Sequence, residues 1–249
     1  MGFWESFDRY AEEYDVWYEN YRPAYESELL ALKTFLPENP EKLKALEIGA
    51  GTGRFASALG VRLGLEPARA MAILAKQRRL EVMLGVAEFL PFKREKLDLV
   101  LIVTALAFFK NPNQALREAL RVLKPGGQIL AGILDRDSTQ GRCLESGNKK
   151  GGFSSKAHFF STAELSTYLL EVGFENLEVC QTLFRQPEKI ESIEFPEEGH
   201  GKGRFVVLSA KKPVQVQKPI QVQKTNLFKY KKPVQEHENQ KLIHQSFKN

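Results

Sequence analysis

The chain has 249 residues, of which 43% are hydrophobic, and a formal net charge of +5. This length and composition are typical of a globular protein with a sizeable core, arranged as one large or two small domains. The positive charge belongs to residues 211–249, which contain nine lysines against Glu236 and Glu238. Residues 1–210 therefore carry a net charge of about −2, which argues against a nucleic-acid backbone as their partner.

Cysteine usage, the N-terminal residues and hydropathy argue against several further classes of protein. Cys143 and Cys180 are the only cysteines and lack metal-binding spacing, so neither a disulfide scaffold nor a thiolate zinc site is expected. The N-terminus carries Glu5 and Asp8 and does not resemble a secretory signal. The longest apolar run, Leu99–Phe109, is shorter than the ~20 residues that span a bilayer. We expect a cytoplasmic protein without a membrane span.

Hydrophobic periodicity predicts helices and strands in alternation. Residues 1–36 place aromatic side chains at spacings of three and four, which predicts an N-terminal helix that ends before Pro37. Further helices are expected from about Arg54 and from Pro67 to Leu80. The predicted strands are short and apolar: Leu43–Ile48, Arg62–Leu65, Glu81–Leu84, Leu97–Thr104, Gln128–Leu134, Leu177–Leu183 and Phe205–Ala210.

Capping signals define two later helices of the chain. Asn113 is the expected cap of a helix that continues to Leu123 and is stopped by Pro125. Ser161 and Glu164 form a capping-box pattern that opens a helix to about Val172, and Gly173 ends it. Between these helices, the polar, glycine-rich residues 136–158 predict a loop, and a loop of this length is more often functional.

This order of elements predicts the fold class. Strands that alternate with helices through residue 172 indicate a parallel sheet with helices on both faces. The last two strands have no helix between them and are expected to form an antiparallel hairpin at one edge. The prediction is an α/β, Rossmann-like, doubly wound, mostly parallel seven-stranded sheet with an antiparallel edge strand.

The most informative motif is the glycine-rich stretch Leu46–Arg54, LEIGAGTGR, which directly follows a predicted strand. Its alternate glycines allow a tight turn and a close approach to a ligand. A dinucleotide fingerprint would have its third glycine at position 54, where this chain has Arg54. S-adenosylmethionine (SAM) has no phosphate, and its cationic sulfonium and amino groups favour nearby carboxylates such as Glu47. The loop therefore favours SAM, although a structural turn can have a similar sequence.

Glu66 ends the second predicted strand, thirteen residues after Gly53. Ligands of open α/β sheets lie outside the carboxyl ends of the strands, and a carboxylate there can accept both hydroxyl hydrogens of a ribose. A solvated glutamate that caps the helix beginning at Pro67 is the alternative. Taken together with the glycine loop, the ribose role is preferred.

Five motifs in order resemble class I SAM-dependent methyltransferases. They are LEIGAGTG, GLEP, GVAEFLPF, LDLVLIVTALAFF and REALRVLKPGGQIL. The sequence is most similar to the type 11 group, which includes ubiquinone- and menaquinone-biosynthesis methyltransferases, and the similarity covers about residues 7–210. The resemblance implies that residues 1–36 form a helical lid on a methyltransferase domain of residues 37–210. The basic tail of residues 211–249 lies beyond the similarity and is predicted from its composition.

The resemblance also implies roles for individual residues in SAM binding. The three loop glycines would line the methionine portion, Glu47 would anchor the loop and the amino group, and Glu66 would hold the ribose. Thr104 and Ala105 would lie near the transferable methyl group. The full set implied to bind the cofactor is Tyr14, Glu47, Gly49, Gly51, Gly53, Glu66, Met71, Ala87, Glu88, Thr104 and Ala105.

Val86 is a departure from the family pattern. The family commonly has an aspartate there that accepts from the adenine amino group. A backbone carbonyl or Glu88 could take that role, or packing could hold the adenine. Since one hydrogen bond to a neutral group contributes only about 0.5–1.5 kcal/mol, we expect altered affinity rather than loss of binding.

Candidates for a general base follow the fifth predicted strand: Asp135, Asp137, Glu145 and His158. Methyl transfer needs a base only when the acceptor must lose a proton, so the sequence leaves the catalytic residues open. Turn formation is the preferred explanation for Asp135 and Asp137, and packing beside Phe159 is the preferred explanation for His158. No pair of histidines or carboxylates has metal-ligand spacing, so no metal is expected.

A small-molecule methyl acceptor is favoured over a nucleic acid. The stretch Thr104–Phe108 lacks the polar-Pro-Pro-aromatic motif of DNA amino-methylating enzymes, and the chain has no Pro-Cys pair for attack on a pyrimidine. Lys212-Pro-Val-Gln recurs in near-identical form in the tail, which predicts a disordered extension that could contact RNA, anionic lipid or a partner, or be dispensable. A SAM-binding protein without catalysis and an RNA methyltransferase remain alternatives.

Overall fold

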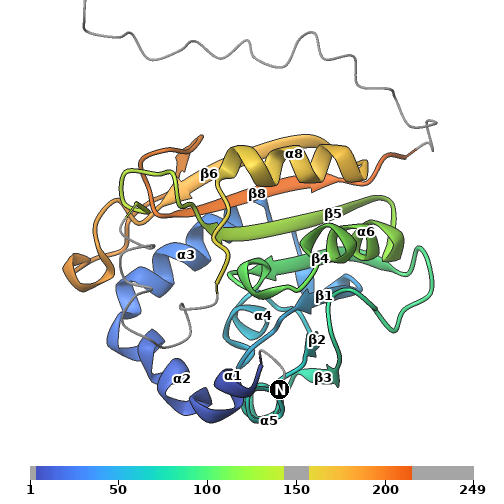
Figure 1. The fold of residues 1–249 in the computed structure, drawn as a ribbon, viewed down its shortest axis with the longest axis horizontal. Helices are drawn as coiled ribbons and strands as arrows, with labels where there is room; N and C mark the ends of the chain where they lie inside the picture. Colours follow the sequence, from blue (N-terminus) through green and yellow to red (C-terminus); the bar gives the residue numbers. More distant parts are fainter. Residues whose placement is uncertain (1–3, 143–156, 215–249) are drawn as a thin grey trace, which may run out of the picture. The chain divides into compact units, whose positions relative to one another are not determined.

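An eight-stranded sheet between two layers of helices forms the body of the protein (Figure 1). The computed structural model describes residues 4–142 and 157–214. The strands are β1 (Ala45–Ile48), β2 (Leu63–Glu66), β3 (Glu81–Leu84), β4 (Leu97–Val103), β5 (Leu123–Leu134), β6 (Glu175–Thr182), β7 (Glu197–Glu198) and β8 (Phe205–Lys211). They are ordered β3-β2-β1-β4-β5-β8-β6-β7.

The strand directions confirm the predicted fold class. Neighbours from β3 to β5 run parallel, whereas β8 runs antiparallel to both β5 and β6. β7 adds an eighth strand that the sequence analysis missed, paired antiparallel to β6 at the edge through Cys180 and Gln181. A two-residue strand has too few side chains to show a period, so only its partner defines it.

The N-terminal region is three helices, not the single helix predicted for residues 1–36. Tyr10 and Tyr21, both with φ of −117°, separate the segments, and Pro23 sits at the start of the third. Proline lacks the N–H needed inside a helix but suits its first turn, so a new helix begins there. The helices are α1 (Glu5–Arg9), α2 (Ala11–Asn20), α3 (Arg22–Phe35), α4 (Arg54–Ala58), α5 (Arg69–Gln77), α6 (Pro112–Val122) and α8 (Thr162–Val172).

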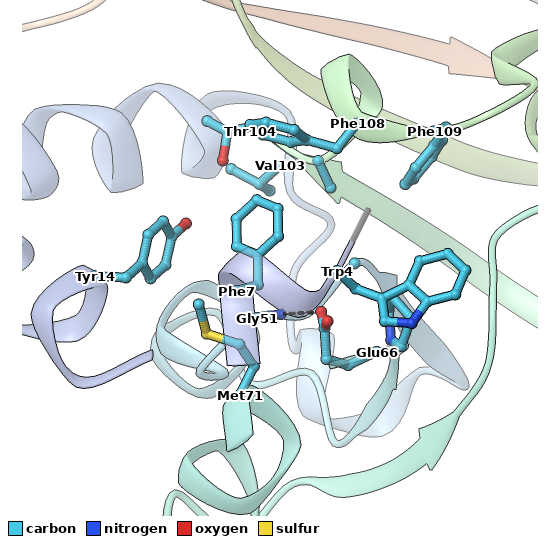
Figure 2. Close-up of a pocket in the computed structure, with 13 residues that line it drawn as sticks. Trp4, Phe7, Tyr14, Gly51, Glu66, Met71, Val103, Thr104, Phe108 and Phe109 are labelled. Atoms are coloured by element: carbon cyan, nitrogen blue, oxygen red, sulfur yellow. Dashed lines mark hydrogen bonds between the residues drawn. The ribbon is translucent and has the colours of Figure 1, made fainter. Parts of the chain in front are cut away.

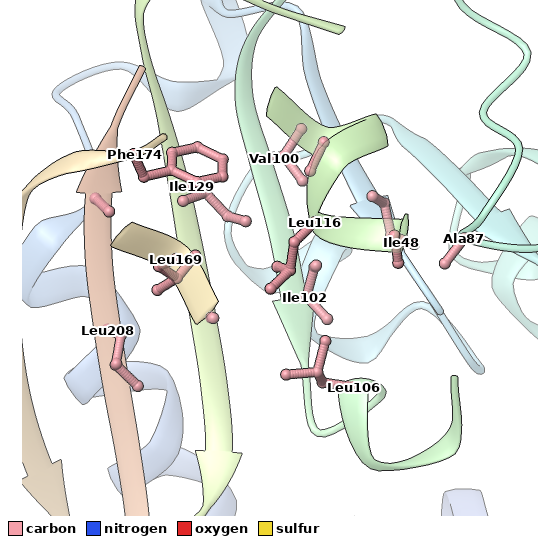
Figure 3. Close-up of a cluster of buried hydrophobic side chains, with 14 of the residues drawn as sticks. Ile48, Ala87, Val100, Ile102, Leu106, Leu116, Ile129, Leu169, Phe174 and Leu208 are labelled. Atoms are coloured by element: carbon pink, nitrogen blue, oxygen red, sulfur yellow. The ribbon is translucent and has the colours of Figure 1, made fainter. Parts of the chain in front are cut away.

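Alternate side chains of β4 belong to two separate hydrophobic cores, one on each face of the sheet. Val100 and Ile102 pack against α6 and α8 on one face (Figure 3), whereas Leu99 and Leu101 pack against α3 and α4 on the other. Side chains alternate across a strand, so a strand covered on both faces is apolar throughout. This explains why β4 gave the clearest strand pattern in the sequence.

The capping predictions have different outcomes. Ser161 caps α8, because its hydroxyl accepts from the Glu164 N–H, and Gly173 ends that helix with a φ of +111°. The cap of α6 is Asn111, whose side chain accepts from the Gln114 N–H at 3.0 Å, and not Asn113 as predicted. Asn111 precedes Pro112, and proline is favoured at the first helical position, so the helix begins two residues earlier than predicted. In the described part of the chain, no helix combines the length and apolarity needed to cross a bilayer.

Candidate functional site

A cavity opens at the carboxyl ends of β1, β2 and β4, where the strand order reverses (Figure 2). Open α/β sheets bind ligands at this point because connections leave in opposite directions and a crevice results. The empty space of the cavity is about 560 Å³, a value that includes open solvent at its mouth. Its lining residues are Trp4, Phe7, Tyr14, Gly49, Gly51, Glu66, Pro67, Met71, Val103, Thr104, Ala105, Phe108 and Phe109.

The glycine loop between β1 and α4 forms one wall of this cavity. Gly49, Gly51 and Gly53 have φ values of +71°, +54° and +79°, a region that side chains disfavour. A Cβ on Gly49 would lie 2.4 Å from the Cβ of Ala105, so this glycine lets the loop pack against the end of β4. Gly53 does not line the cavity, and its missing Cβ allows contact with Ala75 of α5.

Glu66 connects the end of β2 to the glycine loop and lines the cavity. Its Oε2 accepts from the Gly51 N–H at 2.8 Å, and its Oε1 accepts from the Ala68 N–H at 2.9 Å. Burial raises the pKa of Glu66 to about 7, and the two backbone donors oppose this rise. A carboxylate has about four acceptor positions, so both oxygens can still accept from a diol in the cavity.

Glu47 lies beneath the loop and does not line the cavity. Its Oε2 accepts from the Ala56 N–H at 2.9 Å, in the first turn of α4, and burial raises its pKa to about 8. A dinucleotide pyrophosphate would use the N–H groups at such a helix start. Here an oxygen of the protein already takes one of them, which disfavours a pyrophosphate.

Aromatic side chains of the N-terminal helices form the opposite wall. Tyr14 of α2 shares a 2.7 Å hydrogen bond with the Tyr18 hydroxyl, and burial raises its pKa to about 12, opposed by hydrogen bonds to Tyr18 and Thr104. The Phe7 ring packs edge-to-face on Phe108, with centroids 5.0 Å apart (Figure 2). The sequence predicted Tyr14 at the site but not Phe7, for which the clustering of aromatic residues at the N-terminus was the available signal.

Thr104 has an unusual backbone at the end of β4. Its φ is +54°, and its N–H donates to the Gly132 carbonyl of β5 at 2.8 Å. A positive φ is an outlier for a β-branched residue and tends to occur at functional sites. The conformation places Thr104 and Ala105 in the cavity wall, where Ala105 lies beside Gly49 of the glycine loop.

Of the eleven residues that the resemblance implied for the cofactor, seven line the cavity: Tyr14, Gly49, Gly51, Glu66, Met71, Thr104 and Ala105. Glu47 and Gly53 support the loop from behind, as described above. Ala87 is buried in the core cluster beneath α6. Glu88 accepts from the Asn111 N–H at 2.9 Å through Oε1 and so fixes the segment before α6.

The candidate bases Asp135 and His158 lie outside the cavity lining. Asp135 is buried, and its carboxylate accepts from the Thr162 hydroxyl at 2.7 Å and from the Asp137 N–H at 3.0 Å. The His158 ring packs edge-to-face on Phe160, and its side chain is 63% exposed. Glu145 falls outside the described residues, as do residues 215–249, which make up nearly all of the tail. Within the described residues, no cluster of three potential metal ligands occurs.

The residues that line the cavity have the chemistry needed to bind SAM. A carboxylate at the end of β2 matches a ribose, glycines with positive φ allow a close backbone approach, and apolar and aromatic side chains dominate the rest of the wall. Among the described lining residues there is no lysine or arginine, which suits a ligand without phosphate.

Residues 46–131 match the family model of the methyltransferase domain known as Methyltransf_11. An uncharacterized protein of Methanocaldococcus jannaschii is 43% identical over 206 residues, covering 83% of this chain and 98% of the relative. The crystal structure of a SAM-dependent methyltransferase from Thermotoga maritima, described as a possible histamine N-methyltransferase, has a TM-score of 0.80 and 44% identity. The alignment covers 84% of this chain and 99% of the Thermotoga maritima chain.

This chain belongs to the type 11 family of class I SAM-dependent methyltransferases. The fold of this family extends to distant structures. A phosphoethanolamine-type N-methyltransferase of Haemonchus contortus, solved with S-adenosylhomocysteine (SAH), aligns with a TM-score of 0.56 at 17% identity. The alignment spans 76% of this chain and 53% of that one, and at this identity it shows the methyltransferase fold alone.

Proposed function

We propose that this methyltransferase-family protein binds SAM in the cavity and transfers its methyl group to a small-molecule acceptor. The observation that carries the proposal is the pairing of Glu66 with the Gly51 N–H at the cavity wall. This contact joins the glycine loop to a carboxylate suited to a ribose. Membership of the family supports the cofactor assignment, and the proposal extends it to residues of this chain.

Each wall of the cavity has a role in this proposal. Glu66 would accept from the ribose hydroxyls, and Met71 would pack against the adenine. Gly49 and Gly51 would lie along the methionine portion, while Thr104 and Ala105 would border the methyl group. The N-terminal region, residues 1–36, would act as a lid over a catalytic body of residues 37–210, with Tyr14 closing the cavity.

The cofactor supplies a methyl group already activated by its sulfonium, so the protein contributes alignment and exclusion of water. Holding two reactants in register can lower a barrier by roughly 7–11 kcal/mol, which does not require a catalytic base. The aromatic residues Trp4, Phe7 and Phe108 would exclude water from the reacting atoms. Tyr14, with a pKa of about 12, would stay protonated at neutral pH and act by packing and hydrogen bonding.

An amine is the first acceptor class to test. The Thermotoga maritima relative, 44% identical, is described as a possible histamine N-methyltransferase. An amine attacks as its neutral form, and a mainly apolar wall favours that form by disfavouring charge. Hydroxyl and activated-carbon acceptors belong in the same screen.

The first test is ligand binding to the full chain by thermal shift, with SAM, SAH and NAD compared. A ligand at 100 times its dissociation constant stabilises the native state by about 2.7 kcal/mol, which gives a clear shift. We expect a shift with SAM and SAH but not with NAD. A folded protein that responds to neither SAM nor SAH would refute the proposal.

The second test is turnover. Methyl-labelled SAM would be incubated with histamine, other amines, phenols and RNA, and SAH release would be measured in parallel. Labelled product from a small molecule supports the proposed function. SAH binding without turnover of any acceptor would instead support the alternative of a SAM-binding protein without catalysis, and labelled RNA would support the RNA methyltransferase alternative.

A further inference from the structure

Arg54 and Asp15 meet across the boundary between the glycine loop and the N-terminal helices. Arg54 occupies the position at which a dinucleotide loop would have its third glycine, and Asp15 follows Tyr14 in α2. The Arg54 Nε donates to Asp15 Oδ1 and Nη2 donates to Asp15 Oδ2, both at 2.8 Å. Two parallel bonds of this kind fix the relative orientation of both groups.

Arg78 is a second cationic partner of the same carboxylate. Its Nη2 donates to Asp15 Oδ2 at 2.7 Å, and its Nη1 donates to the Thr52 carbonyl of the glycine loop at 3.1 Å. Because Arg78 caps the C-terminal end of α5, Asp15 joins α2 to α4, α5 and the loop together. The pKa of Asp15 is lowered to about 2: burial opposes ionisation, but the hydrogen bonds from Arg54 and Arg78 outweigh it.

Asp8 of α1 makes a similar contact at the other end of α5. Its Oδ1 accepts from the Ala70 N–H at 2.8 Å, in the first turn of that helix. A carboxylate at a helix N-terminus is favoured by the helix dipole and an unpaired N–H. The N-terminal helices are therefore attached at both ends of α5, and Met71 of the cavity wall lies next to Ala70 between the two attachments.

The ion pairs lie largely out of solvent. The Arg54 and Asp15 side chains are 11% and 18% exposed, and the Arg78 side chain is 27% exposed. Exposed surface pairs contribute little, but removing one partner of a buried pair leaves an uncompensated charge. The Arg54 guanidinium also lies 5.5 Å from the centroid of the Tyr18 ring, and Tyr18 is the hydrogen-bond partner of Tyr14.

We propose that Asp15, clamped between Arg54 and Arg78, is a positioning residue that keeps α2 and Tyr14 closed over the cofactor cavity and sets the residence time of SAM. Its side chain does not line the cavity, so it acts through Tyr14 and the glycine loop. Arg54, which directly follows the last loop glycine, thereby serves as an anchor for the lid. This inference rests on the proposed function only for the identity of the cofactor.

The test compares Asp15→Asn and Arg78→Gln with Glu26→Gln in the full chain. Glu26 pairs with Arg22 on α3 at 2.8 Å, with side chains 36% and 70% exposed, so its variant removes an ion pair from the neighbouring surface. All variants carry Trp17→Phe, which leaves Trp4 of the cavity wall as the only tryptophan and hence the fluorescence reporter. SAH dissociation is followed by stopped flow, and hydrogen exchange is measured on the same proteins.

We expect Asp15→Asn to speed SAH dissociation by at least about tenfold, the ratio that corresponds to about 1.4 kcal/mol. Arg78→Gln should give a smaller increase, because the two bonds from Arg54 remain, and Glu26→Gln should give none. Amides of residues 5–20 should exchange faster in Asp15→Asn, while those of β4 keep wild-type rates. Such a local change would not follow from general destabilisation.

Dissociation from Asp15→Asn within twofold of the Glu26→Gln value would overturn the proposal. Faster exchange in β4 as well as in α1 and α2 would also overturn it, because it would mean that Asp15 stabilises the whole fold. If the wild type fails to bind SAH, the proposed cofactor is wrong. The exchange comparison would then still decide whether the clamp holds the N-terminal helices.

Discussion

The ends of β2 and β5 show two outcomes for the same local arrangement. Each has a buried acid whose first carboxylate oxygen accepts from the N–H two residues later, Ala68 for Glu66 and Asp137 for Asp135. The second oxygens differ in partner. That of Glu66 reaches the Gly51 N–H at the cavity, whereas that of Asp135 accepts from the Thr162 hydroxyl at the start of α8.

This difference shows that burial at a strand end does not by itself identify a functional acid. Glu66 is 6% exposed and faces a cavity, while Asp135 is 1% exposed and is enclosed by its own turn and helix α8. A carboxylate can bind a ligand only where part of its acceptor capacity faces open space. We therefore expect mutations at the two ends to separate ligand binding from stability.

The largest effect is expected for Glu66→Ala. Removal of the carboxylate deletes the proposed acceptor for two ribose hydroxyls, and hydrogen bonds to charged groups contribute about 1.5–3 kcal/mol each. SAH affinity should fall at least about 100-fold, measured by isothermal titration calorimetry. Glu81→Ala, at an exposed position of β3, is the control. A Glu66→Ala affinity within threefold of wild type would remove Glu66 from the site.

Asp135→Ala should have the opposite profile. It leaves the Thr162 hydroxyl and the Asp137 N–H without their acceptor, which costs about 2–3 kcal/mol of unfolding free energy. For a chain of this size, the melting temperature should fall by about 5–10 °C. SAH affinity at a temperature where the variant is folded should stay within twofold. A large loss of affinity would instead join Asp135 to the ligand site.

The pH dependence of SAH binding should follow Glu66. Its pKa is raised to about 7, so it is ionised above that pH and increasingly protonated below it. Because only the ionised form can accept both hydroxyl hydrogens, affinity should fall about tenfold between pH 8 and pH 6. Calorimetry in two buffers of different ionisation enthalpy would detect proton release at pH 6. Unchanged affinity over this range would contradict the role.

The smallest effect is expected for Glu88→Gln. Glu88 follows β3 and was implied to border the adenine, but its Oε1 accepts from the Asn111 N–H. A glutamine carbonyl can keep this bond, so SAH affinity should change less than about threefold. The same assay as for Glu66 applies. A loss of affinity above tenfold would place Glu88 in the adenine site. The acid that follows β3 would then bind ligand, as is proposed for Glu66 at the end of β2, and would not be structural like Asp135 after β5.

The sequence predicted the fold class and much of the cavity because the signals are local. β4 is apolar on both faces, Ser161 and Gly173 mark the limits of α8, and the loop glycines are required by backbone angles within the loop itself. Such features depend on residues within a few positions of one another. The family resemblance depends on the same local motifs, and seven of the residues that it implied for the cofactor line the cavity.

Only the tertiary structure decided which residues act together across long separations. The pairing of Asp15 with Arg54 joins positions 39 residues apart, and that of Arg78 with Asp15 spans 63. The enclosure of Asp135 by Thr162, and the placement of Glu47 behind the loop, likewise depend on packing between elements. One sequence specifies side-chain chemistry and local spacing, but contacts between distant residues follow from how the helices dock on the sheet.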